Sequence, residues 1–249
     1  MNLQLIGEGK TTKVYRDGNR ALKLYVGASP EEAYREAEKQ AFAFEAGLPV
    51  PKVYGVEKLD CGTALVMEYI DGKELAWPRM DRAERKAVFE KLVGLQLRVH
   101  GVDAKGLPPL SERLARRIKH APYLDETAKE RLAGRLRDLD KGGTCLCHGD
   151  FHTSNVLDDG GKQWIIDWVD AVCGDPLADA CRSYLIFRQY ISRMSGVYLK
   201  LYCKRKAVEP EAVLAWLPVV AAARLSENMN ERETAFLLDM IRPDQLSCF

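Results

Sequence analysis

The pattern of hydrophobic and polar positions divides the chain into a strand-rich beginning and a helix-rich remainder. Residues 3–25 alternate apolar and polar side chains around an Asp17-Gly18 hairpin signal, so they predict three short strands. The apolar run at residues 64–70 predicts a further strand. Helical spacing dominates residues 81–241, apart from a short β-branched run, and the whole pattern therefore predicts an α+β protein.

One helix is predicted among the first strands, at residues 30–46. Ser29 is a favourable N-cap, Pro30 suits the first helical position, and Glu32 completes a capping box. Gly47 follows at the C′ position, where a left-handed residue ends many helices. The apolar face of this helix is predicted to consist of Ala33, Ala37, Ala41 and Phe44.

The remainder of the chain carries several further helices. Asp81 and Glu84 form a capping box that opens a helix ending at His100, and the position of His100 indicates a structural role. Pro218 should kink the helix that contains it. The other predicted helices occupy residues 111–120, 127–139, 177–204, 211–225 and 232–241.

Composition excludes several classes of protein. The 249 residues include 37 basic and 36 acidic side chains, so no overall basic field favours a nucleic acid partner. No apolar run reaches the roughly 18 residues that a membrane helix needs, and no signal peptide pattern is present. Seven cysteines without a CxxC pair predict free thiols in a reducing cytoplasm. Nothing in the sequence indicates the oligomeric state.

A polar turn at residues 148–155 lies between apolar flanks and carries the candidate chemistry. Asp150 and Asn155 belong to this turn, and Asp167 ends a β-branched run twelve residues after Asn155. Three such oxygen donors suit Mg²⁺, which is usually held by one or two carboxylates together with substrate phosphates. A carboxylate that is not needed for metal can orient a hydroxyl and accept its proton. These are the components of a phosphoryl transfer site.

The pair of motifs HGDxHxxN and IIDW resembles the catalytic and metal-binding loops of the aminoglycoside phosphotransferase and choline kinase family of small-molecule kinases. The resemblance covers essentially the whole chain and implies the protein-kinase-like bilobal fold. Residues 1–70 would form an amino-terminal nucleotide-binding lobe with a small antiparallel sheet and one helix. Residues 71–249 would form a mainly helical lobe with the catalytic loop and the acceptor site.

The resemblance also implies a reaction and its participants. The γ-phosphoryl of ATP would pass to a hydroxyl of a small molecule, such as an aminoglycoside, an amino alcohol like choline, or a sugar. The sequence does not distinguish ATP from GTP. Asp150 would be the catalytic base, His152 would orient it or contact a phosphate, and Asn155 and Asp167 would hold Mg²⁺.

The two histidines of the loop have a second interpretation. His148 and His152 are four residues apart, which is a zinc-binding spacing when it occurs on a helix. Gly149 and the turn-like composition argue against a helix, so His148 is expected to hold the backbone of the loop instead.

The nucleotide would be held by the amino-terminal lobe. Gly7 and Gly9 would let backbone amides approach a phosphate, although such a glycine pair is often only a turn. Lys23 on the third strand could simply face solvent, but the resemblance makes it the phosphate-binding lysine. Its partner is expected to be Glu36, in preference to the other glutamates of the helix. By the same resemblance, the hinge that recognises the purine consists of Met67, Glu68, Tyr69 and Ile70.

Two rival functions are less consistent with the sequence. Gly9-Lys10-Thr11 could end a P-loop, but that motif needs a glycine where Gln4 stands and a helix immediately afterwards. A Ser/Thr protein kinase needs a long activation loop, whereas here Gly174 follows Asp167 almost at once. The remaining alternative is a nucleotide-binding pseudokinase or interaction module, which would be expected to lack one of the residues Lys23, Asp150, Asn155 and Asp167.

The sequence leaves two interpretations each for Asp179 and for the acidic residues after Ser226. Asp179 resembles the buried acid that braces the catalytic loop in this family, but it could equally be a favourable charge at a helix N-terminus. A local acidic surplus after Ser226 would favour a cationic acceptor if it lay near the site, and a solvated acidic tail is the simpler interpretation. The residues concerned are Glu227, Glu231, Glu233, Asp239 and Asp244.

Overall fold

A computed structural model describes residues 3–9, 12–27, 29–75, 80–227 and 229–242. They belong to two compact units, Met1–Met80 with Thr153–Ala171 and Asp81–His152 with Val172–Phe249. This division differs from the lobe boundary predicted at residue 70, because the segment after the catalytic loop pairs with the first unit. Its strand β8 (Val156–Asp158) pairs on one side with β6 (Lys73–Glu74) and on the other with β9 (Gln163–Ile165).

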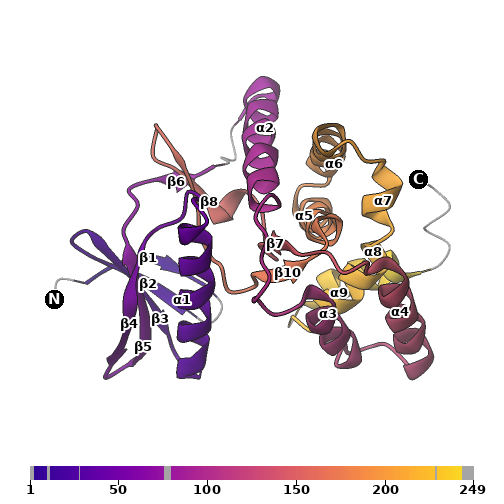
Figure 1. Cartoon of the computed structure of the whole chain (residues 1–249), viewed down its shortest axis with the longest axis horizontal. Coiled ribbons are helices and arrows are strands. Elements are labelled where there is room, and N and C mark those ends of the chain that lie inside the picture. The colour runs from indigo at the N-terminus through magenta and orange to yellow at the C-terminus, as the bar shows by residue number, and fades with distance from the viewer. Residues whose placement is uncertain (1–2, 10–11, 28, 76–79, 228, 243–249) are drawn as a thin grey trace. The chain divides into compact units, whose positions relative to one another are not determined.

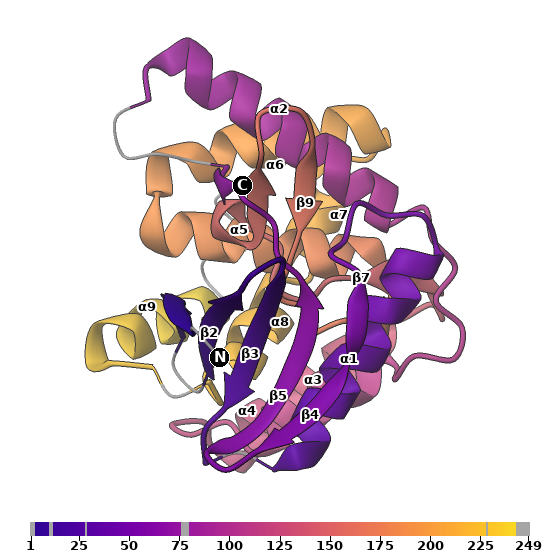
Figure 2. The same ribbon diagram turned by 90° about the vertical axis from the view of Figure 1, so that its left-hand side faces the viewer.

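The first unit contains a five-stranded antiparallel sheet, whose strands lie side by side in Figure 2. The three strands predicted in residues 3–25 are confirmed, and Gly18, with φ of +60°, forms the turn between the second and the third. The strand order is β1 (Gln4–Glu8), β2 (Thr12–Asp17), β3 (Arg20–Tyr25), β5 (Gly62–Glu68) and β4 (Val53–Leu59).

Helix α1 (Pro30–Glu45) packs against β4 and β5 of this sheet (Figure 1). Gly47 has φ of +77° and ends the helix as predicted. The predicted capping box is not formed, because the Ser29 hydroxyl donates to Glu31 and the Glu32 amide bonds the Ser29 carbonyl. The buried face consists of Ala33, Glu36, Ala37, Gln40 and Ala43, whereas Phe44 is exposed.

The second unit is organised around α5 (Pro176–Tyr190), every residue of which is buried from Ala178 to Phe187. A helix that is buried all round must be covered on every side. The elements that pack on it are α6 (Ser192–Lys206), α7 (Pro210–Leu214), α8 (Leu217–Arg224) and β7 (Cys145–Cys147) (Figure 1). Strand β7 pairs with β10 (Val172–Gly174), and the other helices are α2 (Arg82–Val99), α3 (Leu110–Lys119), α4 (Glu126–Leu139) and α9 (Glu231–Ile241).

Two predicted helices are each replaced by a pair. The segment 177–204 is interrupted at Ile191, whose backbone angles of −139° and 58° are not helical. The segment 211–225 is divided into α7 and α8, and Pro218 lies in the first turn of α8. A proline there removes no helical hydrogen bond, whereas within one continuous helix it would clash with the preceding turn. Among the described helices, none is both long and apolar enough to cross a membrane.

Candidate active site

Lys23 is the centre of an ion-pair network in the first unit. Its ammonium donates to Glu36 Oε1 at 2.8 Å and to Asp167 Oδ1 at 2.8 Å. Strand β3 buries the lysine to 7% exposure, and α1 buries the glutamate to 1%. The structure thus brings together three of the residues that the sequence analysis selected, including the choice of Glu36 among the glutamates of the helix.

The network changes the acidity of its members. Burial disfavours the charged form of Lys23, but the carboxylates of Glu36 and Asp167 outweigh it and raise the pKa of Lys23. Burial raises the pKa of Glu36, although Lys23 acts in the opposite direction. The Tyr25 hydroxyl donates to Glu36 Oε2, and burial together with that carboxylate raises the pKa of Tyr25. Tyr25 stands two residues after Lys23 and shares its face of the strand, although it was not among the residues predicted from the sequence.

A cavity of about 540 Å³ adjoins this network in the first unit. That volume lies within the usual range of small-molecule sites. All the first-unit residues that the sequence analysis assigned to nucleotide or metal line it, namely Gly7, Gly9, Lys23, Glu36, Met67, Glu68, Tyr69, Ile70, Asn155 and Asp167. Lys10 and Thr11, which entered the P-loop alternative, lie outside the described residues.

Asn155 and Asp167 supply oxygen donors to the wall of this cavity. Asn155 ends a 3₁₀ turn at Thr153–Asn155, and its carbonyl accepts from the Ile166 amide at 3.0 Å. Asp167 has φ of +65°, an uncommon conformation for a residue other than glycine and one that is concentrated at functional sites. Its side chain is 42% exposed. An amide and an accessible carboxylate are suitable ligands for a hard cation.

Asp150 of the second unit is held from three directions by His148, His152 and Arg182. The Asp150 amide donates to His148 Nδ1 at 3.3 Å, and His152 Nε2 lies 3.3 Å from Asp150 Oδ2. Arg182 Nη2 donates to Asp150 Oδ1 at 3.2 Å. His148 therefore holds the loop's backbone as predicted, and His152 contacts Asp150. Among the described residues, no group of three or more His, Cys, Asp and Glu side chains forms a metal site.

The neighbours of Asp150 keep it ionised. Burial opposes the charged form, but the hydrogen bond from His152 and the positive charges of Arg182 and Arg224 hold the pKa of Asp150 well below its usual value. A carboxylate in this state accepts hydrogen bonds and positions a hydroxyl, and it retains its negative charge throughout the physiological pH range.

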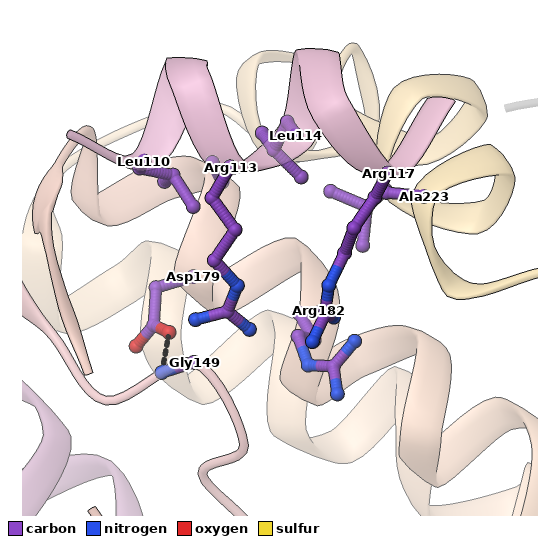
Figure 3. Close-up of a pocket in the computed structure, with 10 residues that line it drawn as sticks. Leu110, Arg113, Leu114, Arg117, Gly149, Asp179, Arg182 and Ala223 are labelled. Carbon is purple, nitrogen blue, oxygen red and sulfur yellow. Dashed lines mark hydrogen bonds between the residues drawn. The ribbon is translucent and has the colours of Figure 1, made fainter. Parts of the chain in front are cut away.

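Asp179 on α5 braces the same loop. Its Oδ1 accepts from the Gly149 amide at 2.7 Å (Figure 3), and its Oδ2 lies 2.9 Å from His100 Nε2. Burial opposes ionisation of Asp179, yet His100, His148 and the Gly149 amide lower its pKa. Of the two open interpretations of Asp179, the geometry supports the brace. His100 is buried at 3% exposure and is structural, as expected.

Further charged residues beside Asp150 were not selected from the sequence. We call Arg117, Arg182 and Arg224 the arginine cluster. Glu227 Oε1 accepts from Arg117 Nη1 at 2.5 Å and from Arg182 Nη1 at 2.6 Å, and Glu227 Oε2 lies 4.0 Å from Arg224 Nε. The simpler interpretation of the residues after Ser226 as a solvated acidic tail is therefore wrong for Glu227, which is only 18% exposed.

Two other acidic residues of that segment make contacts in the structure. Glu233 completes a capping box with Asn230 at the start of α9 and also accepts from the Tyr190 hydroxyl of α5, and Asp239 pairs with Arg242. Asp244 lies outside the described residues. The sequence offered one signal for the cluster, since Arg182 follows Asp179 by three residues and hence shares its side of α5.

Comparison with known proteins identifies the chain's relatives. The family model described as "Phosphotransferase enzyme family" (APH) matches residues 2–217. The chain belongs to this family. The APH phosphotransferase resemblance that the sequence motifs indicated is thereby confirmed.

Solved structures share the fold of this APH family member. Aminoglycoside phosphotransferase APH(4)-Ia, as a thermostable mutant in complex with ADP and hygromycin B, is 17% identical with a TM-score of 0.70, covering 98% of this chain and 92% of that one. A choline/ethanolamine kinase family protein from Mesorhizobium loti is 20% identical with a TM-score of 0.67, covering 100% and 89%. The predicted α+β, protein-kinase-like fold is confirmed.

A curated relative is much longer than this APH protein. "Acyl-CoA dehydrogenase family member 10" from Mus musculus is 25% identical over 205 residues, which cover 66% of this chain. The matched part spans only 19% of that relative.

Proposed function

We propose that this protein transfers the γ-phosphoryl group of ATP or GTP to a hydroxyl of a small molecule. The observation that carries the proposal is the Lys23 network, in which one buried cation joins Glu36 and Asp167 at the wall of a 540 Å³ cavity. Membership of the APH phosphotransferase family supports the reaction class.

The first unit is proposed to bind the nucleotide. Lys23 holds the α- and β-phosphates, and Glu36 keeps the lysine in position. Gly7 and Gly9 bring backbone amides toward the phosphates. The backbone of residues 68–70 and the side chain of Met67 hold the purine.

Asn155 and Asp167 are proposed to hold Mg²⁺, and their oxygen atoms at the cavity wall suit this ion. When bound, Mg²⁺ neutralises charge on the phosphates. The ammonium of Lys23 lies against Asp167 and keeps that carboxylate in place.

The second unit is proposed to bind and orient the acceptor. Asp150 accepts the hydroxyl proton while His152 and Arg182 hold its two oxygens. The acceptor oxygen bonds to the γ-phosphorus as the bond from that phosphorus to the β–γ bridging oxygen breaks. The products are a phosphate monoester and the nucleoside diphosphate. Six described cysteines are free thiols, and we propose a cytoplasmic location for this chemistry.

The test is nucleotide consumption with Mg²⁺ across amino alcohols, aminoglycosides, sugars and hydroxy acids. Turnover on an acceptor, abolished by Asp150→Ala, is the expected result. Tight nucleotide binding without turnover on any acceptor would favour the pseudokinase or interaction module. Absence of nucleotide binding, measured by calorimetry with Mg-ATP and Mg-GTP, would overturn the proposal.

A further inference from the structure

The charge beside Asp150 is unusual for a site that would take an aminoglycoside or an amino alcohol. The three guanidinium groups of the arginine cluster converge on Glu227, and one of them, Arg182, also bonds Asp150. Three positive charges thus face two carboxylates, and an ammonium ion placed there would meet repulsion.

Glu227 does not offer an oxygen to a cationic ligand. Its Oε1 accepts from both Arg117 and Arg182, and its Oε2 lies 3.3 Å from Arg182 Nη2. Glu227 hence already serves to hold the guanidinium groups together.

Arg224 contributes a positive charge that is incompletely compensated. The residue is 5% exposed, and its Nε and Nη1 atoms have no hydrogen-bond partner among the described residues. Burial lowers the pKa of Arg224, and the neighbouring Arg182 lowers it further. A buried guanidinium with unsatisfied donors is costly unless a water molecule or a ligand supplies acceptors.

The adjoining cavity adds to this positive character. Arg113, Arg117 and Arg182 all line a small cavity of about 20 Å³ between α3 and α5, beside the Gly149 amide (Figure 3). That volume admits about one water molecule, so the cavity cannot itself hold an acceptor. It places further guanidinium charge next to the catalytic loop.

We propose that Arg224, together with Arg117 and Arg182, binds an oxyanion of the acceptor, which is therefore an alcohol that carries a carboxylate or phosphate group. The inference rests on the phosphoryl transfer proposed above and names its acceptor class. Arg182 touches both Asp150 and Glu227, so the reacting hydroxyl and the oxyanion are held a short distance apart in one small molecule. Guanidinium groups suit both oxyanions because they donate two parallel hydrogen bonds.

The test compares acceptors that differ only in charge. Hydroxycarboxylates of increasing chain length are assayed against their primary amides and the amino alcohols of equal length, and glycerol 3-phosphate is assayed against glycerol. The anion of a pair should have a kcat/KM about 10-fold or more above its neutral counterpart. The carboxylate and phosphate arms identify which oxyanion is used. Preference for the amides, glycerol or amino alcohols would overturn the inference while leaving phosphoryl transfer established.

The variant Arg224→Gln should raise KM for the anionic acceptor about 10- to 100-fold and abolish the preference over the amide. Arg224→Lys keeps the charge but loses the planar donors, and should give a KM between those of the wild-type chain and Arg224→Gln. It provides the test if Arg224→Gln does not fold. The control is Arg137→Gln on α4, whose side chain is exposed and which should leave both constants unchanged. An equal change for anion and amide in the Arg224 variants would contradict an oxyanion contact.

A direct binding measurement separates this inference from the proposed reaction. If no acceptor is phosphorylated, a hydroxycarboxylate and glycerol 3-phosphate are titrated into the full chain by calorimetry. Binding that Arg224→Gln weakens, but Arg137→Gln does not, would uphold the oxyanion site although the proposed reaction failed. Absence of binding to the wild-type chain would overturn the oxyanion site as well.

Discussion

The Lys23 network and the arginine cluster are opposite solutions to the burial of charge. In the first unit one ammonium lies between two carboxylates, Glu36 and Asp167. In the second, Asp150 and Glu227 lie among three guanidinium groups. The excess charge is negative in the first region, which suits the proposed Mg²⁺, and positive in the second, which suits the proposed oxyanion.

The same contrast appears in the acidity of the buried carboxyl groups. Burial raises the pKa of Glu36 despite Lys23, whereas His152, Arg182 and Arg224 lower the pKa of Asp150 despite burial. Burial acts in the same direction on both carboxyl groups, because it raises the pKa of each. At Glu36, burial and the nearby Asp167 outweigh the single ammonium, whereas at Asp150 the hydrogen bond from His152 and the two guanidinium charges outweigh burial.

The largest expected effect follows from removing the negative charge of Asp150, to which Arg182 of the arginine cluster bonds. Asp150→Asn keeps the size of the side chain but cannot accept the hydroxyl proton, so we expect kcat to fall by about 10²- to 10⁴-fold. Steady-state kinetics with the best acceptor would measure this. Asp138→Asn on the exposed face of α4 is the control. A loss below about 10-fold would show that Asp150 is not the base.

The reverse experiment removes the cation from the first region. Lys23→Met leaves Glu36 buried beside Asp167, and breaking such a pair costs about 3 kcal/mol or more in the free energy of unfolding. Denaturant unfolding would measure the loss, and calorimetry should show weaker nucleotide binding. The double variant Lys23→Met with Glu36→Gln should regain part of the stability because no buried charge is then left alone. Equal stability of the single and double variants would contradict this account.

The Lys23 network and the motif around Asp150 could be predicted because the relevant sequence signals are local. The motif around Asp150 and Asn155 lies within eight consecutive residues, and Asp167 follows at the end of a short β-branched run. The Lys23–Glu36 pair joins adjacent elements, a strand and the helix that follows it. Hairpin and capping signals predicted the strands of residues 3–25 and the end of α1 at Gly47.

The arginine cluster could not be predicted because its members come from three separated helical segments. Arg117 lies on α3, Arg182 on α5 and Arg224 at the end of α8, and only tertiary packing brings them to Glu227. From the sequence alone, an arginine on a helix that is buried in an ion pair cannot be distinguished from one that faces solvent. The break at Ile191 was missed for a related reason, since no glycine or proline marks it.

A smaller effect is expected from Asp179, which braces the loop that carries Asp150. Asp179→Asn removes the carboxylate that accepts from Gly149 and lies against His100, and we expect a loss of about 1 to 3 kcal/mol in unfolding free energy. kcat should fall as well, because the loop that carries Asp150 loses its support. Asp125→Asn is the matched control, since asparagine caps a helix as well as aspartate does. Unchanged kcat in Asp179→Asn would show that the contact with Gly149 does not position the loop.

The smallest effect is the pH dependence of stability, whose sign should be opposite for Glu36 and Asp179. The pKa of Glu36 is raised in the folded state, so its stabilising contribution is complete below about pH 4 and is lost as pH rises through the folded pKa. The pKa of Asp179 is lowered, so its contribution is present above about pH 4 and is lost as pH falls through the folded pKa.

Denaturant unfolding of the wild-type chain, Glu36→Gln and Asp179→Asn across the acidic range would test this contrast. The stability difference between wild type and Glu36→Gln should shrink as pH rises, while that between wild type and Asp179→Asn should grow. Each whole unit of pKa shift changes the free energy of unfolding by about 1.4 kcal/mol in total across its pH window. Parallel slopes would mean that the hydrogen bonds from His100 and Gly149 do not lower the pKa of Asp179, because burial alone would raise both pKa values.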